Sequence, residues 1–436
     1  MLTAFSLHIK NRLPFLKEKR LLIAVSGGVD SVVLSCLCKK LDFNFALAHC
    51  NFNLRAEESN KDENFILKLG DQLGAEVFVQ NFDTQGYADV NKLSIQMAAR
   101  ELRYHWFAEL ADRLHFDYIL TAHHADDNLE TFLINLTRGT GLNGLTGIPL
   151  VNNNVIRPLL NYSRETIIKY ALDNNILWRE DRSNESRKYL RNKLRHDVVP
   201  ILKEINPNLL ESFQNTIDNL NDTADIVDES LNAVAKRAIT KIDDNGITYK
   251  ISEFKKVNNP KAYLFEMFKA YGFTEWNDVL DLLGAESGKQ VLSKTHRLIK
   301  HREFLILTEF PDGRHKVIKI KESSVISYFP SGGLHFKNVD HIKDKNDSKI
   351  YLDKGKLKYP LELRQWKEGD YFYPLGMKGK KKISKYLKDE KLSLVEKENT
   401  WVLTSEGNII WVIGKRADER YKVTEATSSI LKIELK

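Results

Sequence analysis

Ser26-Gly27-Gly28-Val29-Asp30-Ser31 is the stretch that decides the fold of this chain. It follows an apolar run, Leu21 to Val25, that predicts a buried strand, and it precedes Val32 to Leu37, which predicts the start of a helix. A Gly-Gly turn between strand and helix lets backbone amides converge without obstruction by Cβ atoms. Those amides and the positive end of the helix dipole favour an anion. The stretch therefore predicts a phosphate or pyrophosphate site.

This loop differs from a Walker A loop, because no lysine follows its glycines. The pattern S-G-G-x-D-S resembles the PP-loop of ATP pyrophosphatases, which split ATP between its α and β phosphates. Ser26 and Ser31 add hydroxyl donors, and Asp30 is a candidate ligand for a metal ion. An ordinary strand-to-helix connection is the alternative, and the strand–turn–helix context argues against it.

The composition is that of a globular protein with a sizeable core. The chain has 436 residues, of which 42% are hydrophobic and 29% charged, which suggests two to three domains. No apolar run reaches the length of a membrane span, and Met1–Phe5 does not resemble a signal peptide, so a cytoplasmic protein is expected. The three cysteines, Cys36, Cys38 and Cys50, form neither a C-x-x-C motif nor an even set, and we interpret them as buried apolar residues.

Positive charge is concentrated in two segments, although the net charge is only +7. Seven lysines lie between Lys378 and Lys391, and seven lysines or arginines lie between Arg179 and Arg195. Local excesses of this kind suit a nucleic-acid backbone. A solvated lysine-rich face is the alternative interpretation.

The first 150 residues alternate strand and helix patterns. Strands are expected at Leu21–Val25, Phe45–His49, Glu76–Phe82 and Tyr118–His123. Helices are expected at Asp30–Lys40, Glu57–Leu73 and Ile95–Leu114, with another starting near Asp126. This order predicts an α/β fold, a doubly wound and mostly parallel sheet of Rossmann-like, PP-loop ATPase type.

The rest of the chain divides into a helical middle domain and a small α+β C-terminal domain. Residues from about 160 to 205 and from Asn206 to about Gly246 have helical patterns, and Ile251–Ile306 is mixed. Phe310-Pro311-Asp312-Gly313 marks a turn and a boundary. We therefore expect a catalytic domain at 1–205, a helical and mixed domain at 206–310, and a basic domain at 311–436.

Three polar clusters are expected at the same rim of the sheet, because ligands of such sheets bind at the carboxyl ends of the strands. They are the glycine loop, His49-Cys50-Asn51 and His123-His124-Ala125-Asp126-Asp127. Asp127 and Glu130 are spaced i, i+3 and share one helix face, where they suit magnesium or an ammonium group. A charged helix start capped by an acid is the alternative.

A pair of arginines follows later in the chain. Arg191 and Arg195 are spaced i, i+4, so on a helix they share one face. Arginine pairs suit carboxylate or phosphate. The alternative is a surface helix whose arginines have no specific partner.

Several sequence blocks follow one another in an order typical of one known family. They are Ser26–Ser31, His49–Arg55, Ala99–Tyr104, His123–Thr131, Arg138–Gly141, Glu180–Asn184, Arg191–Arg195 before Pro200, and Gly369–Met377 with Gly379–Lys382. With them the chain resembles the tRNA(Ile)-lysidine synthetase family of the PP-loop superfamily. That family activates the wobble cytidine of a tRNA(Ile) with a CAU anticodon by adenylating its 2-carbonyl oxygen with ATP. The ε-amine of L-lysine then attacks the ring carbon and AMP leaves.

The resemblance implies a role for each candidate residue. Ser26, Gly27, Gly28, Val29, Asp30 and Ser31 would bind ATP, and Asp30 or Asp126 would hold Mg²⁺. Asp127, Glu130, Arg191 and Arg195 would bind L-lysine, and the candidate catalytic residues are Asp30, Asp126, Asp127 and His123. Lys380, Lys381, Lys382 and Lys385 would contact the tRNA. The family also allows for a homodimer, and no membrane partner is expected.

Three other functions compete with this interpretation. A PP-loop tRNA thiolase activates the same kind of carbonyl but uses reactive cysteines, and no C-x-x-C motif is present here. A PP-loop amide ligase would not need the two basic extra domains. An RNA-binding protein without activity would leave the acids and glycines unexplained, and ATP–pyrophosphate exchange separates it from an enzyme.

Overall fold

The computed structural model describes residues 1–54, 57–179, 190–310, 317–343 and 346–436. The chain separates into two compact units, Met1–Val227 and Asp228–Lys436. The predicted blocks at Glu180–Asn184 and Arg55, and residues 311–313 of the predicted boundary, lie outside the described residues. Within the described part of the chain, no helix is both long enough and apolar enough to cross a membrane.

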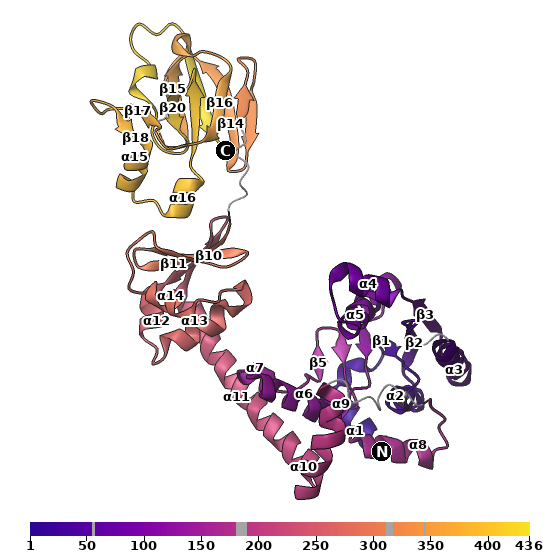
Figure 1. The fold of residues 1–436 in the computed structure, drawn as a ribbon. Coiled ribbons are helices and arrows are strands. Elements are labelled where there is room, and N and C mark those ends of the chain that lie inside the picture. The colour runs from indigo at the N-terminus through magenta and orange to yellow at the C-terminus, as the bar shows by residue number, and fades with distance from the viewer. Residues whose placement is uncertain (55–56, 180–189, 311–316, 344–345) are drawn as a thin grey trace. The chain divides into compact units, whose positions relative to one another are not determined.

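The first unit is built on a six-stranded sheet in the order β3-β2-β1-β4-β6-β5 (Figure 1). All neighbouring strands run parallel except β5, which pairs antiparallel with β6. The strands are β1 (Arg20–Ala24), β2 (Asn44–Asn51), β3 (Val77–Asn81), β4 (Tyr118–Leu120), β5 (Val151–Asn152) and β6 (Val155–Ile156). The predicted doubly wound, mostly parallel sheet is therefore confirmed.

Helices cover both faces of this sheet (Figure 1). The helices of the first unit before α11 are α1 (Leu2–Arg12), α2 (Val29–Lys40), α3 (Glu57–Leu73), α4 (Thr84–Asn91), α5 (Ile95–Leu114), α6 (Ala125–Arg138), α7 (Leu142–Leu145), α8 (Arg164–Asp173), α9 (Leu190–Lys193), a π-helical turn at Leu194–Val198, and α10 (Val199–Ile205). Leu21 and Ile23 of β1 join the core formed with α1, α2, α3 and α8. Leu22, pointing to the opposite face, packs with Trp106 and Phe107 of α5. Burial on both faces explains why β1 is a continuous apolar run.

Most predicted elements of this unit are found with small differences at their ends. The helices at Glu57–Leu73 and Ile95–Leu114 have the predicted bounds. The predicted strand Tyr118–His123 is too long, because β4 ends at Leu120. His124 instead caps α6: its Nδ1 accepts the Asp127 amide at 3.4 Å, while the Asp127 carboxylate accepts the His124 amide at 3.1 Å. The last residues of the predicted strand thus lead into the helix start.

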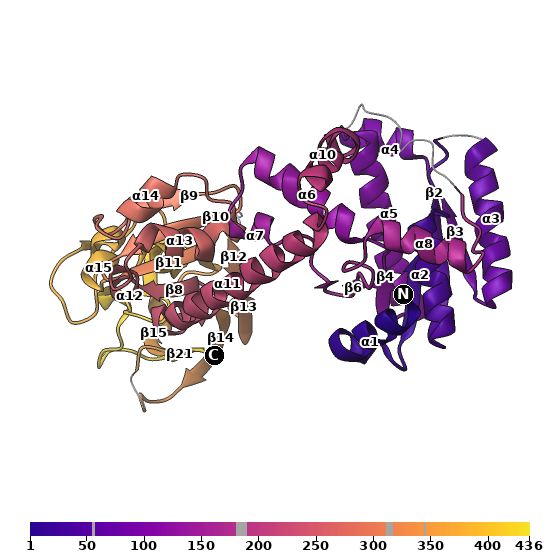
Figure 2. The same cartoon turned by 90° about the horizontal axis from the view of Figure 1, so that it is seen from below.

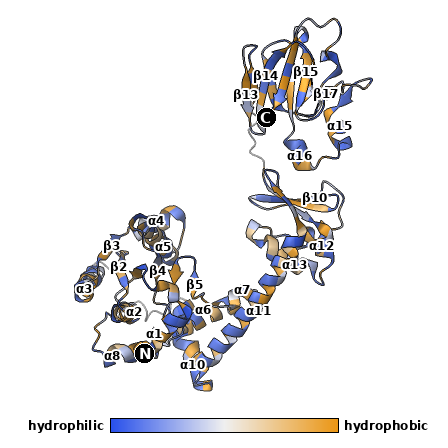
Figure 3. Ribbon diagram, turned by 180° about the vertical axis from the view of Figure 1, so that it is seen from behind, coloured by the Kyte–Doolittle hydropathy of each residue, from blue (hydrophilic) through white to orange (hydrophobic). Residues whose placement is uncertain are grey.

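Helix α11 (Leu209–Ala238) is a single helix of 30 residues (Figure 2). At 1.5 Å per residue it is about 45 Å long. Hydrophobic and hydrophilic residues both occur along it (Figure 3). Phe213 and Ile217 pack with Leu129 in the first unit, and Val234 and Ala238 belong to a core of the second. The predicted helical pattern to Gly246 is wrong at its end, since a strand begins at residue 239.

The second unit begins with a five-stranded antiparallel sheet in the order β7-β8-β11-β10-β9. Its strands are β7 (Ile239–Asp243), β8 (Gly246–Lys250), β9 (Gln290–Leu292), β10 (His296–His301) and β11 (Phe304–Glu309). The accompanying helices are α12 (Ile251–Lys255), α13 (Pro260–Phe268) and α14 (Trp276–Asp281). The middle region contains helices, as expected. It also contains this five-stranded sheet, which the mixed sequence pattern did not predict in detail.

Two four-stranded antiparallel sheets form the core of the C-terminal region, in the orders β12-β16-β19-β20 and β13-β14-β21-β15. Their strands are β12 (Ile318–Ile320), β13 (Ile326–Phe329), β14 (Gly332–Val339), β15 (Lys349–Asp353), β16 (Leu361–Gln365), β19 (Trp401–Ser405), β20 (Asn408–Val412) and β21 (Ile430–Leu435). A hairpin of β17 (Tyr371–Phe372) and β18 (Lys381–Lys382) leads into α15 (Ile383–Asp389), and α16 (Leu394–Glu398) follows. This region is α+β, as predicted.

Candidate active site

The glycine loop joins β1 to α2 and presents backbone amides at the helix start. The first hydrogen bond within α2 runs from the Val32 amide to the Gly28 carbonyl at 3.1 Å, so the three preceding amides have no acceptor within the helix. Gly27 has φ +89°, a conformation that only glycine adopts without strain. The Ser31 hydroxyl donates to the Gly28 carbonyl at 3.0 Å and accepts the Ser26 amide at 3.2 Å. The loop is thus held in an anion-binding form.

A cavity of about 710 Å³ opens beside this loop in the first unit. Its walls include the loop residues Ser26, Gly28, Val29, Asp30 and Ser31, the β2 residue Cys50, the α5 residues Arg103 and Tyr104, the residues His123, His124 and Asp127 after β4, and Arg164, Arg191 and Arg195. This volume falls in the range of pockets for small ligands. The predicted convergence of polar clusters at the carboxyl ends of the strands is therefore present in the structure.

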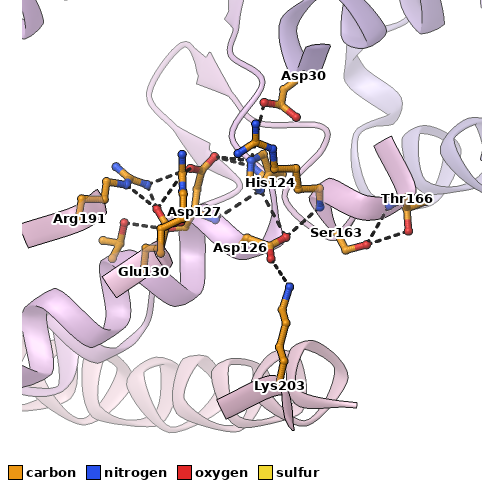
Figure 4. Close-up of polar contacts among 12 residues, drawn as sticks. Asp30, His124, Asp126, Asp127, Glu130, Ser163, Thr166, Arg191 and Lys203 are labelled. Atoms are coloured by element: carbon orange, nitrogen blue, oxygen red, sulfur yellow. Dashed lines mark hydrogen bonds and ion pairs between the residues drawn. The ribbon is translucent and has the colours of Figure 1, made fainter. Parts of the chain in front are cut away.

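The four residues predicted to bind lysine form one ion-pair cluster (Figure 4). Glu130, which is 1% exposed, accepts from Arg191 Nε at 2.8 Å and from Arg195 Nε at 2.6 Å. The Asp127 carboxylate lies 3.1 Å from Arg191 Nη2 and 3.2 Å from Arg195 Nη2. Asp127 and the two arginines line the cavity, whereas Glu130 lies behind them. The cluster therefore presents both signs of charge to a ligand.

The ionisation of Asp127 is set by opposing effects. Burial raises the pKa of its carboxyl, but the neighbouring His124 and Arg191 side chains and the hydrogen bond from the His124 amide outweigh burial, so the pKa lies below its usual value. Asp127 is consequently a carboxylate at neutral pH. A carboxylate that faces a cavity suits the ammonium group of an amino acid.

Asp30 is the candidate metal ligand that faces the cavity. Its Oδ1 atom is buried, and the structure describes no hydrogen-bond partner for it. Burial raises the pKa of Asp30, while the neighbouring His124 and Arg164 oppose this rise. A buried, unpartnered carboxylate oxygen beside a phosphate site fits Mg²⁺, which combines one or two carboxylates with phosphate oxygens and water. Within the described ranges, no group of three side chains that could ligate a metal ion occurs.

Both carboxylate oxygens of Asp126, the other predicted magnesium ligand, accept hydrogen bonds from the protein (Figure 4). Its Oδ1 atom accepts from Lys203 Nζ at 2.6 Å, and its Oδ2 atom accepts the Arg164 amide at 2.8 Å. The imidazole of His124 separates it from Asp30, with Nδ1 3.7 Å from Asp126 and Nε2 3.8 Å from Asp30. Asp126 is not among the residues that line the cavity, and both of its carboxylate oxygens have protein partners, whereas Asp30 lines the cavity. The assignment of Mg²⁺ to Asp30 or Asp126 stays a prediction.

His123 was predicted as a candidate base, and it lines the cavity. Its Nδ1 atom lies 3.0 Å from the Thr121 hydroxyl. Burial lowers the pKa of His123 to about 4, so the imidazole is neutral at pH 7 and has a free lone pair. The same low pKa makes it a weak base.

The cysteines are poor nucleophiles in this environment. Cys38 belongs to the core, as expected, and burial raises the pKa of both Cys36 and Cys38. Cys50 lines the cavity, but burial raises its pKa to about 12. Because the thiolate is the reactive form of cysteine, these side chains do not provide the chemistry that a thiolase needs.

The predicted tRNA-binding lysines of the second unit differ in their surroundings. Lys381 Nζ forms an ion pair with Asp389 at 2.8 Å and lies over the Tyr386 ring. Lys380, Lys382 and Lys385 are exposed. Lys382 pairs with Tyr371 across the β17–β18 hairpin. Lys381, which precedes Lys382 in the same strand, points to the other side of the hairpin, as strand alternation requires.

Sequence reasoning did not single out Arg164, which lines the cavity from the first position of α8. It quoted Arg103 only within a family block, and Arg103 lies over the Phe52 ring at 5.2 Å. The helix start at Ser163 was a usable signal, since its hydroxyl accepts the Thr166 amide at 3.1 Å as an N-cap does. Nothing in the local sequence shows that this helix start faces the glycine loop.

Comparisons with known proteins identify the domains of the chain. A PP-loop domain matches residues 1–202, a TilS substrate-binding domain residues 242–310, and a TilS substrate C-terminal domain residues 361–434. The chain is 37% identical to a tRNA(Ile)-lysidine synthase of Bacteroides thetaiotaomicron, over 96% of this chain and 95% of that relative. A solved U34-tRNA thiolase NcsA of Methanococcus maripaludis covers 50% of this chain and 78% of its own, at 17% identity and a TM-score of 0.43, which is too low to bear on function.

A second relative is similar to this chain along its full length. A tRNA(Ile)-lysidine synthase of Parabacteroides distasonis is 38% identical over 99% of both chains. The three domain matches follow in chain order, and the first of them contains the loop and the ion-pair cluster. By this full-length identity, the chain belongs to the tRNA(Ile)-lysidine synthase family.

Proposed function

We propose that this chain ligates L-lysine to carbon 2 of the wobble cytidine of a tRNA(Ile) with a CAU anticodon, using ATP. The observation that carries the proposal is the shared cavity, which has the glycine loop on one side and Asp127, Arg191 and Arg195 on another. One wall suits a polyphosphate and the other suits an amino acid. Family membership supplies the identity of the tRNA and of the amino acid.

The first step activates the cytosine ring. The 2-carbonyl oxygen attacks the α-phosphorus of ATP, the bond to the β-phosphate oxygen breaks, and pyrophosphate leaves. The amides at the start of α2 and the Ser26 and Ser31 hydroxyls would bind the phosphates. Asp30 would hold Mg²⁺, which offsets phosphate charge when it is bound.

The second step forms the new carbon–nitrogen bond. The lysine ε-amine attacks carbon 2, and the bond from that carbon to the adenylated oxygen breaks, so AMP leaves with the oxygen. Asp127 would bind an ammonium group of lysine, and Arg191 or Arg195 would bind its carboxylate. Glu130 holds both arginines in place from behind. His123 is neutral and faces the cavity, but its low pKa makes it a weak base, so the proton of the attacking amine would go to His123 or to a carboxylate of the cavity wall.

The tRNA would contact the basic hairpin of the second unit through its phosphates. Lys380, Lys382 and Lys385 are exposed and fit this role better than Lys381, whose charge is balanced by Asp389. The target cytidine lies in an anticodon loop and is unpaired, so its presentation to the cavity costs little.

Lys381 and Lys382 are neighbours in the chain and form a matched pair for testing whether this hairpin binds tRNA. Replacing Lys382 by alanine should weaken tRNA binding and reduce the slope of log K against log salt by about one, because one phosphate contact is lost. Replacing Lys381 by alanine should leave this slope unchanged and lower the melting temperature, because the ion pair with Asp389 is lost. Filter binding at several salt concentrations measures both. Equal slopes for the Lys382 variant and the unchanged protein would contradict this assignment.

A tRNA thiolase is the second candidate, and the structure disfavours it. The only cysteine in the cavity wall is Cys50 among the residues the structure describes, and burial keeps its thiol protonated. Mass spectrometry of the anticodon fragment separates the two reactions. Lysine ligation adds the mass of lysine minus water, whereas thiolation exchanges oxygen for sulfur.

A further inference from the structure

Arg164 differs from the other arginines that line the cavity. Arg191 and Arg195 are paired with Asp127 and Glu130, and Arg179 is paired with Glu58 and Asp62. Arg103 lies over the ring of Phe52. Within the described residues, the Arg164 guanidinium has neither a carboxylate nor a ring as partner. Arg164 is half-buried, so its guanidinium is accessible to an anionic ligand in the cavity.

The backbone of Arg164 is fixed by a short chain of hydrogen bonds. Its amide donates to Asp126, whose second oxygen accepts from Lys203. Ser163 caps the helix that Arg164 begins. Asp126 therefore holds the first residue of α8 in place.

Helix α8 also has a fixed relation to the glycine loop. Ile167 of α8 belongs to the same core as Val32 and Val33, which follow the loop in α2. Arg164 and Asp30 line the same cavity. The guanidinium and the loop amides therefore face one volume, on the side where Asp30 carries an unpartnered oxygen.

We propose that Arg164 contacts the polyphosphate of ATP and stabilises pyrophosphate as it leaves. The guanidinium provides a forked donor that matches phosphate oxygens, and it adds a positive charge where the loop offers only neutral amides and hydroxyls. This assignment rests on the proposed function, because it requires ATP to be split between the α and β phosphates. Asp126 and Lys203 act on it indirectly, as positioning residues.

The test compares binding of Mg²⁺-pyrophosphate, Mg²⁺-ATP and AMP to the full chain by calorimetry, without tRNA or lysine. Arg164→Gln should weaken pyrophosphate and ATP binding by about 10- to 100-fold, as expected for a lost charge-assisted contact, and leave AMP binding unchanged. Arg164→Lys should show intermediate losses, because it keeps the charge without the fork. Lys169→Gln is the matched control, since it removes an exposed charge from the same helix.

Two outcomes would overturn the assignment. One is pyrophosphate binding that Arg164→Gln leaves unchanged. The other is an equal loss for AMP and pyrophosphate, which would mean a structural role. Thermal melting of both variants shows whether the fold is kept, and the lysine variant decides the matter if the glutamine variant is unstable. If the unchanged protein failed to ligate lysine, the proposed function would be refuted. The contact between Arg164 and the polyphosphate would still be judged by the binding data.

Discussion

Replacing Asp127 by asparagine is expected to raise the KM for L-lysine by about 30- to 4000-fold, corresponding to about 2–5 kcal/mol for a truncated charge pair. Asp127 faces the cavity as a carboxylate, and its charge is what an ammonium group would bind. Asparagine keeps the shape and an acceptor oxygen for the His124 amide, which now bonds to Asp127 at 3.1 Å. Glu130 continues to hold both arginines, so the cluster should stay assembled.

Steady-state kinetics with varied lysine measure this effect, and ATP binding by calorimetry should be unchanged. Asp173→Asn, at the exposed end of α8, is the matched control with the same loss of charge. An unchanged KM for lysine in the Asp127 variant would place the amino acid elsewhere. A parallel loss of ATP binding would assign Asp127 to the nucleotide.

Replacing Asp30 by asparagine should reduce Mg²⁺-dependent ATP–pyrophosphate exchange by about 100-fold or more, because a metal ion contributes several kcal/mol to phosphate chemistry. The basis is the buried Oδ1 atom, for which the structure describes no partner. Asp126→Asn is the matched comparison and should cause a smaller loss together with a lower melting temperature. Asparagine still offers an acceptor to the Arg164 amide but loses the ion pair with Lys203.

The exchange assay is carried out with unmodified tRNA and without lysine, over a range of Mg²⁺ concentrations. A higher Mg²⁺ requirement in the Asp30 variant alone would support the metal assignment. If the Asp126 variant lost exchange and the Asp30 variant kept it, the prediction of Asp126 as the metal ligand would be supported instead.

The sequence was sufficient where the signal is local. The glycine loop lies between β1 and α2 because an apolar run, two glycines and a second apolar run leave few alternatives. The helices at Glu57–Leu73 and Ile95–Leu114 were predicted with their observed bounds. The fold class follows from the alternation of such elements.

The sequence alone was insufficient where the site depends on which way a side chain points, or on contacts between residues that are far apart in the chain. Asp126 and Asp127 are neighbours, yet successive helix positions differ by about 100°, and only one faces the cavity. The sequence alone does not say which. The lysine-binding arginines were found, but their pairing with Glu130 and Asp127 joins residues that are far apart in the chain. Lys381 was predicted to contact tRNA together with its neighbours, and its ion pair with Asp389 is a contact that the sequence alone does not show.

The central claim is tested most directly by incorporation of radiolabelled L-lysine into an unmodified tRNA(Ile) with a CAU anticodon. The account predicts label in the tRNA that requires ATP and Mg²⁺ and is abolished by Asp127→Ala. Absence of label while pyrophosphate is still released would contradict it, since the carbonyl would then be activated for a nucleophile other than lysine.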